Sequence, residues 1–176
     1  VLPPEMFARL DETGVAKFDA YWDEEKIRNT ELWQKIAPRA IVATGATKSY
    51  VVKTFHGNAA ERPLPYKLQD ASPAADYWAY GLLLYRFLSG EHLLSVNRDD
   101  DLVGATEYQQ AMTWSPEEIQ VQLAPLLEKN YHTAVELLTC LLQPSAQKRE
   151  EKSLTFLLQN ALFFKEDEKT GEKKDA

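Results

Sequence analysis

One apolar stretch, residues 72–94, constrains the fold of this chain more than any other feature. Between residues 77 and 88 the only strongly polar side chain is Arg86, and Gly81 is the one small gap. A helix that is apolar on nearly all of its faces belongs inside a core, and this run is far shorter than the roughly 20 residues that span a bilayer. The stretch therefore predicts a buried central helix. The side chains that we expect to be largely buried are Tyr77, Trp78, Leu82, Leu83, Tyr85 and Phe87.

Both ends of this helix carry local signals. Ser72 can accept a hydrogen bond from an N-terminal amide, and Pro73 suits the first helical position, where an N–H group is not needed. Gly90, after Ser89, supplies the C-terminal stop.

Asp76 is the unusual residue of the stretch, because it places a carboxylate near the start of an apolar helix. An ionised acid that is buried without partners costs several kcal/mol, so backbone N–H groups or a cation from another segment should hold it. The simpler interpretation is an acid that the positive end of the helix dipole favours.

Residues 76–91 resemble a segment of the eukaryotic protein kinases. They read D-Y-W-A-Y-G, then Leu84 and Tyr85, then L-S-G-E, which is similar to the family pattern D-x-W-x-x-G…L-Y-x-x-L-x-G-E. The resemblance implies that this is the central helix of the C-terminal lobe, with Asp76, Trp78 and Gly81 as motif residues. It also implies that the Asp76 carboxylate bonds the backbone of the catalytic loop.

Two further motifs follow in family order. The opening residues V-L-P-P-E-M resemble the A-P-E end of the activation segment, with Pro3 in place of Ala, and residues 141–149, L-L-Q-P-S-A-Q-K-R, resemble L-L-x-x-D-P-x-x-R. Residues 160–163 resemble the closing H-P-F-F with three substitutions. The resemblance implies a buried ion pair between Glu5 and Arg149, in which arginine could make two parallel bonds to the carboxylate.

The segment between the first two motifs is enlarged, because 70 residues separate Glu5 from Asp76. A rival alignment takes residues 65–67 as the A-P-E equivalent and shortens this distance. It puts Lys67 where the acid should be and leaves Arg149 unpaired, so we prefer Glu5.

The insert, about residues 10–71, has its own predicted elements. Residues 19–37 have the apolar spacing of one or two amphipathic helices with core-packing side chains, and residues 40–43 and 50–55 are β-prone runs that flank a turn at Gly45. We expect these two runs to pair as an antiparallel hairpin. The apolar positions of the helical part are Tyr21, Trp22, Ile27, Leu32, Trp33 and Ile36.

The rest of the chain is predicted to be helical. Residues 97–101 are expected to form a solvated acidic loop. Ser115 and Glu118 predict a capping box at the start of a helix that Pro125 limits. Residues 134–142 predict an apolar helix that ends before Pro144. Residues 154–164 predict a last apolar helix, and residues 165–176 a disordered polar tail.

Composition excludes several classes of site. A net charge of −7 argues against a nucleic-acid or anionic-membrane surface. The single cysteine, Cys140, lies on an apolar helix face and is expected to be a core residue, and the three histidines have no ligand-like spacing, so we expect no metal site. The chain shows no signal peptide, and we expect a cytoplasmic protein. Its first residue is not Met and it opens inside a motif, so we expect a fragment of a longer protein.

The parts of a kinase that perform chemistry do not occur in this sequence. It contains no G-x-G, no V-A-I-K lysine, no H-R-D and no D-F-G, which hold ATP, Mg²⁺ and the acceptor hydroxyl in that family. We therefore expect no catalytic, cofactor-binding or metal-binding residue in this chain, which alone should be inactive. The resemblance implies that ATP and Mg²⁺ bind the longer parent, whose N-terminal lobe and catalytic loop would precede Val1.

The fold class that follows is mainly α: residues 1–164 as the C-terminal part of a protein kinase-like large lobe, with a small β-hairpin in the insert. The resemblance implies a parent that transfers the γ-phosphate of ATP to Ser or Thr of protein substrates. The alternatives are a pseudokinase scaffold that binds protein partners, and an unrelated helical adaptor that would leave Glu5 and Arg149 far apart.

Overall fold

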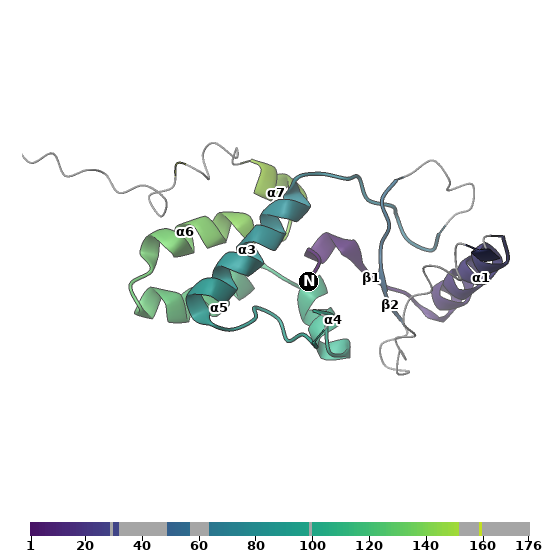
Figure 1. The fold of residues 1–176 in the computed structure, drawn as a ribbon, viewed down its shortest axis with the longest axis horizontal. Coiled ribbons are helices and arrows are strands. Elements are labelled where there is room, and N and C mark those ends of the chain that lie inside the picture. The colour runs from purple at the N-terminus through teal and green to yellow at the C-terminus, as the bar shows by residue number, and fades with distance from the viewer. Residues whose placement is uncertain (29, 32–48, 57–63, 99, 152–158, 160–176) are drawn as a thin grey trace, which may run out of the picture.

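The computed structural model describes residues 1–28, 30–31, 49–56, 64–98, 100–151 and 159 (Figure 1). This part of the chain is mainly helical, as the sequence predicts, and it contains one small antiparallel sheet. In chain order its elements are η1 (Pro4–Met6), β1 (Phe7–Arg9), α1 (Glu12–Arg28), β2 (Tyr50–Val52), α3 (Ala74–Ser89), α4 (Ala105–Met112), α5 (Pro116–Glu128), α6 (His132–Leu141) and α7 (Ala146–Glu150). None of the described helices has both the length and the apolar character needed to cross a bilayer.

The predicted central helix is α3, and its end signals work as expected. The Ser72 hydroxyl accepts a hydrogen bond from the Ala74 amide at 3.2 Å, and Pro73 already has helical dihedral angles. Gly90 ends the helix with a φ of 83°, in the left-handed region that favours glycine, and its amide donates to the Arg86 carbonyl.

The burial predicted for α3 is right on one side and wrong on the other. Trp78 is fully buried and Tyr85 is 6% exposed, but Leu83 is 65% exposed and Phe87 is 85% exposed. Tyr77 and Leu82 are half-buried. The prediction fails at Leu83 and Phe87 because none of the described elements covers that face of α3. A helix that is apolar all round thus has solvent on one side.

The core lies between α3 and the three helices α4 to α6 (Figure 1). The rings of Trp78 and Trp114 meet edge to face with centroids 5.9 Å apart, an arrangement favoured by aromatic quadrupoles. Gly81 lies where α3 crosses α6. A Cβ atom at Gly81 would be 2.8 Å from Cδ2 of Leu142 and 3.0 Å from Cβ of Leu141, so glycine permits this close approach.

The small sheet joins the start of the chain to the insert. β1 and β2 are antiparallel, with Phe7 opposite Val52 and Arg9 opposite Tyr50. The run 50–55 therefore contains a strand, as predicted, but its described partner is β1, which the sequence analysis missed. The other predicted strand, residues 40–43, and the Gly45 turn lie outside the described residues.

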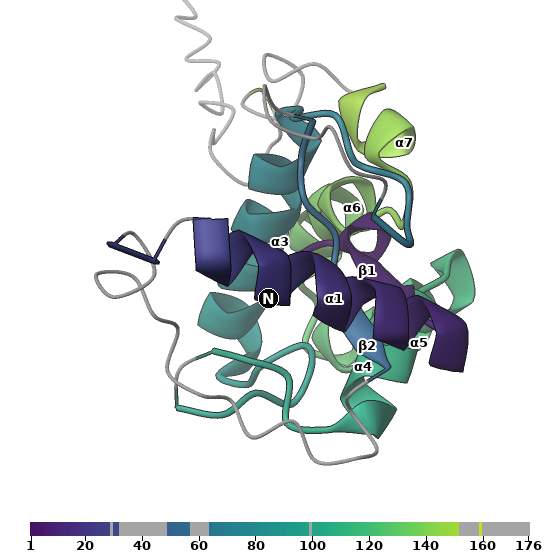
Figure 2. The ribbon, with the colours of Figure 1, turned by 90° about the vertical axis from the view of Figure 1, so that its right-hand side faces the viewer.

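Helix α1 lies beyond the sheet, at the far end from α6 (Figures 1 and 2). The Asp11 carboxylate caps it by accepting from the Gly14 amide at 2.7 Å, which starts the helix earlier than residue 19. Phe18 contacts Trp22 and Tyr66, with ring centroids 6.1 and 6.2 Å apart. Ile27 is 79% exposed, so the prediction that it packs in a core is wrong.

Helix α5 begins at the predicted N-cap Ser115, whose hydroxyl accepts from the Glu118 amide at 3.2 Å. It continues through Pro125 to Glu128, so the prediction that Pro125 limits it is wrong. Leu123 and Leu126 on either side of the proline are each 1% exposed, and their burial offsets the missing backbone bond. The predicted final helix and the polar tail lie outside the described residues, apart from residue 159.

Candidate functional site

The site that joins two sequence motifs is a buried arginine. Arg149 lies in the short helix α7, which starts after Ser145, and its side chain is almost completely removed from solvent. An unpaired guanidinium in such a place would be strongly destabilising, so its partners decide whether this part of the fold is stable.

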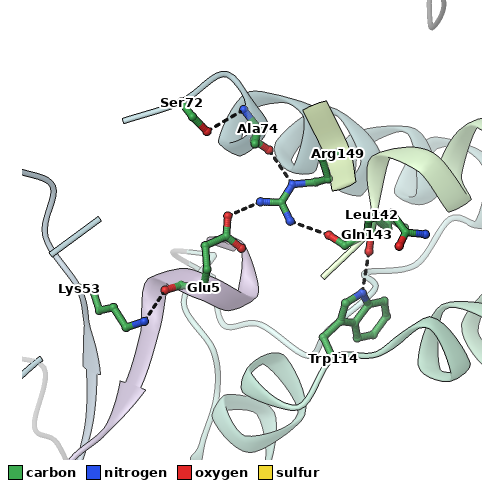
Figure 3. Close-up of polar contacts among 8 residues, drawn as sticks. All are labelled: Glu5, Lys53, Ser72, Ala74, Trp114, Leu142, Gln143 and Arg149. Atoms are coloured by element: carbon green, nitrogen blue, oxygen red, sulfur yellow. Dashed lines mark hydrogen bonds and ion pairs between the residues drawn. The ribbon is translucent and has the colours of Figure 1, made fainter. Parts of the chain in front are cut away.

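Arg149 divides its donors among three acceptors (Figure 3). Nε donates to the Ala74 carbonyl at 2.9 Å, Nη1 donates to the Gln143 carbonyl at 2.6 Å, and Nη2 donates to the Glu5 carboxylate. The two carbonyls belong to the first residue of α3 and to the turn after α6. One side chain therefore connects the N-terminal motif, the central helix and the C-terminal motif.

The predicted ion pair between Glu5 and Arg149 is present, across 144 positions of sequence. The predicted pair of parallel bonds is not, because Arg149 bonds only Oε1, while Oε2 is buried without a hydrogen-bond partner among the described residues. The other arms of the guanidinium are turned to backbone carbonyls. Lys67, the rival motif position, is exposed.

One tryptophan contacts this ion pair, and a second holds the chain segment next to it. The Arg149 guanidinium carbon lies 5.7 Å from the centroid of the Trp78 ring, within the range of a cation–π contact. Trp114 donates from Nε1 to the Leu142 carbonyl at 2.9 Å, which fixes the segment leading to Gln143. Of the motif residues, Glu5, Trp78 and Arg149 thus form one cluster.

A lysine of the insert also reaches this cluster. Lys53 follows β2, and its Nζ donates to the backbone carbonyl of Glu5 at 2.8 Å (Figure 3). The Lys53 amide also donates to the Met6 carbonyl at 2.7 Å. Lys53 could not be identified from the sequence, because nothing in a β-prone run distinguishes a lysine whose acceptor is a distant backbone oxygen.

Asp76 stands apart from the cluster, and the prediction of its burial is wrong. Its side chain is exposed, and no described residue bonds its carboxylate. One face of α3 carries four residues spaced at intervals of four, three and four positions: Asp76, Tyr80, Leu83 and Phe87. We call this exposed face the α3 stripe.

The cluster can hold segments together, and its residues offer neither a nucleophile nor an open position for a ligand. Among the described residues no three of His, Cys, Asp and Glu are grouped so that they could hold a metal ion. Cys140 is half-buried beside Leu137 and Leu141, as a core residue would be. No protein-family model, no curated protein and no solved structure matches this chain.

Proposed function

We propose that this chain is the C-terminal part of the large lobe of a protein kinase-like domain, and that it supplies scaffold while the catalytic parts belong to a longer parent. The observation that carries the proposal is the bond between Glu5 and Arg149. Both residues occupy positions of motifs that resemble those of the family, and local helix preferences cannot bring together residues 144 positions apart.

In this proposal the parent is a cytoplasmic enzyme that transfers the γ-phosphate of Mg-ATP to Ser or Thr of protein substrates. Phosphoryl transfer depends on placing the metal, the phosphates and the acceptor hydroxyl in line, so a rigid lobe beneath those parts is a requirement of the chemistry. Arg149 meets this requirement by fixing the start of α3 to the two ends of the lobe.

The test uses the longer parent protein. The coding sequence before Val1 should specify H-R-D-x-x-x-x-N and D-F-G, and the purified parent should move label from γ-labelled ATP to Ser or Thr of casein in the presence of Mg²⁺. The matched control replaces the D-F-G aspartate with asparagine and should abolish transfer. Absence of both motifs from the parent would overturn the proposal that it is an active kinase and would favour a pseudokinase scaffold.

The α3 stripe gives a second test of the same proposal. In a complete lobe the remainder of the domain would cover it, whereas here Phe87 is 85% exposed. We expect Phe87→Ala to destabilise the longer parent by about 3–5 kcal/mol. In the chain 1–176 the same change should move stability by less than about 0.5 kcal/mol.

Urea unfolding of the parent and of the chain 1–176, each with and without Phe87→Ala, measures both values. An equal, small effect in the chain and in the parent would show that nothing covers this face and would count against the kinase-like lobe.

A further inference from the structure

A second site lies beside the small sheet and shares no side chain with the arginine cluster. It is a hollow of about 260 Å³, formed by the start of the chain, β2, the acidic loop and α4. Its lining residues include Leu2, Phe7, Val52, Leu102, Tyr108, Asp100 and Asp101.

One wall of the hollow is apolar and is held in place by the sheet. Phe7 and Val52 are directly opposite each other in the β1–β2 pair, so their side chains lie on the same face. Phe7 packs edge to face on Tyr108 with centroids 5.7 Å apart. Phe7 and Leu102 are buried, whereas Leu2 and Val52 are each 41% exposed at the rim.

Another part of the wall is acidic. Asp100 and Asp101 are exposed, and the described lining holds no lysine or arginine, although Val1, the first residue of the chain, is also part of it. The loop that carries them is closed by two bonds between Asn97 and Asp101, from the Asn97 amide to the Asp101 carbonyl at 2.8 Å and from the Asp101 amide to Asn97 Oδ1 at 3.0 Å. The neighbouring cation Lys53 is bonded to the Glu5 carbonyl.

The size of the hollow indicates what kind of ligand it could hold. Small-molecule and cofactor sites usually occupy about 300–1,000 Å³ and enclose most of the ligand. This hollow is smaller and open at an exposed apolar rim, so it suits one or two side chains of an extended protein segment. Charge complementarity with the acidic wall favours a cationic side chain as one of them.

We propose that this hollow is a docking site for a protein segment that presents a leucine-like side chain next to arginine or lysine. The apolar side chain enters between Val52 and Leu102, and the cation lies against Asp100 and Asp101. Because Val52 comes from the insert, the enlarged segment supplies half of the apolar rim. Docking does not depend on phosphate transfer by the parent, so this inference goes beyond the proposed function.

The test measures fluorescence anisotropy with the full chain 1–176 and three fluorescein-labelled peptides, GSRLRGS, GSELEGS and GSRSRGS. We expect GSRLRGS to bind at least about tenfold more tightly than either of the others, with an affinity that falls as salt is added. The double variant Asp100→Asn/Asp101→Asn and the single variant Val52→Lys should each weaken its binding by about tenfold or more.

The matched control is Glu128→Gln/Glu136→Gln, which removes two exposed acids of α5 and α6 and should leave binding within about twofold. Circular dichroism checks that each variant is folded. Equal binding of the three peptides, or binding that survives the Asp100 and Asp101 changes, would overturn the proposal. Self-association of the chain that Val52→Lys abolishes, without peptide binding, would overturn it in favour of a second copy.

Discussion

Arg149 satisfies its buried charge mainly with backbone oxygens. Two of its three hydrogen bonds go to the carbonyls of Ala74 and Gln143, and one goes to the Glu5 carboxylate. A single carboxylate would fix only one segment, whereas this division fixes three. The planar fork of the guanidinium is suited to the task because its donors point in different directions from one rigid plane.

The first prediction is that Arg149→Lys is not conservative. Lysine keeps the charge, but its single ammonium group cannot reach all three acceptors, so at least one buried oxygen loses its donor. We expect the free energy of unfolding to fall by about 2–3 kcal/mol, a typical value for hydrogen bonds to charged groups. Arg98→Lys, in the exposed loop, is the control and should change stability by less than about 0.5 kcal/mol.

Urea denaturation followed by circular dichroism gives both values. If the two lysine variants were equally stable, the three-way bonding of Arg149 would contribute nothing and this interpretation would fail.

At the scale of elements, the crossing of α3 and α6 depends on the missing side chain of Gly81. Alanine is favoured over glycine in a helix by about 1 kcal/mol, so propensity alone would make Gly81→Ala stabilising. The new methyl group would meet Leu141 and Leu142, both fully buried, and neither can move without disturbing the core. We expect a net destabilisation of about 1–3 kcal/mol, the usual range for overpacking.

Ala79→Gly, at an exposed position of α3, calibrates the propensity term and should cost about 1 kcal/mol. Thermal unfolding of both variants decides the matter. A Gly81→Ala variant with a raised melting temperature would contradict the close approach of the two helices.

The elements that could be predicted from the sequence are those whose causes are local. Ser72 and Gly90 specify the ends of α3, and Ser115 specifies the start of α5, because caps act on amides a few residues away. β1 could not be predicted in this way, since it has three residues and its partner β2 lies about 40 positions away. Whether Phe87 is buried depends on what packs against α3, which its own periodicity does not reveal.

The same distinction applies to the candidate site. The contact between Glu5 and Arg149 could be predicted because both are side chains in motifs that resemble those of a family. The bonds to Ala74, Gln143 and Lys53 could not, because each involves a backbone oxygen, and every residue type carries one.

At the scale of the whole molecule, the described residues of the insert that contact the helical body include those of β2, whose Tyr50 stacks on Tyr108 of α4, and Lys53. β2 pairs with β1, and Lys53 bonds the backbone of Glu5, whereas α1 lies beyond the sheet (Figure 2). The two sites are therefore connected, because β1 directly follows the turn that carries Glu5 and also supplies Phe7 to the hollow.

Tyrosines of the core also make the free energy of unfolding vary with pH in the alkaline range. Burial is the largest cause that raises the pKa of Tyr85 and of Tyr108 above 10.0, and the charges of Glu91 and Asp101 act in the same direction. A raised folded-state pKa means that the unfolded chain loses these protons first. The stabilisation is therefore complete below about pH 10 and is lost as pH rises through the folded-state values.

We expect the free energy of unfolding to fall between about pH 9 and about pH 11, and Tyr85→Phe/Tyr108→Phe to reduce that fall. Urea titrations at the two pH values measure it. Stability that stays constant or rises over this interval would contradict the prediction.

The central claim is that one ion pair joins the two ends of the described fold, and a double-mutant cycle with Glu5→Gln and Arg149→Met tests it most directly. Each single change should lower the free energy of unfolding, Glu5→Gln by about 3–5 kcal/mol because it leaves the Arg149 charge buried without its acid. The second change removes the partner that the first change leaves stranded. The double variant should therefore lose about 1–3 kcal/mol less unfolding free energy than the two single variants lose in total. Single effects that add to within about 0.5 kcal/mol would show that Glu5 and Arg149 do not interact and would contradict the account.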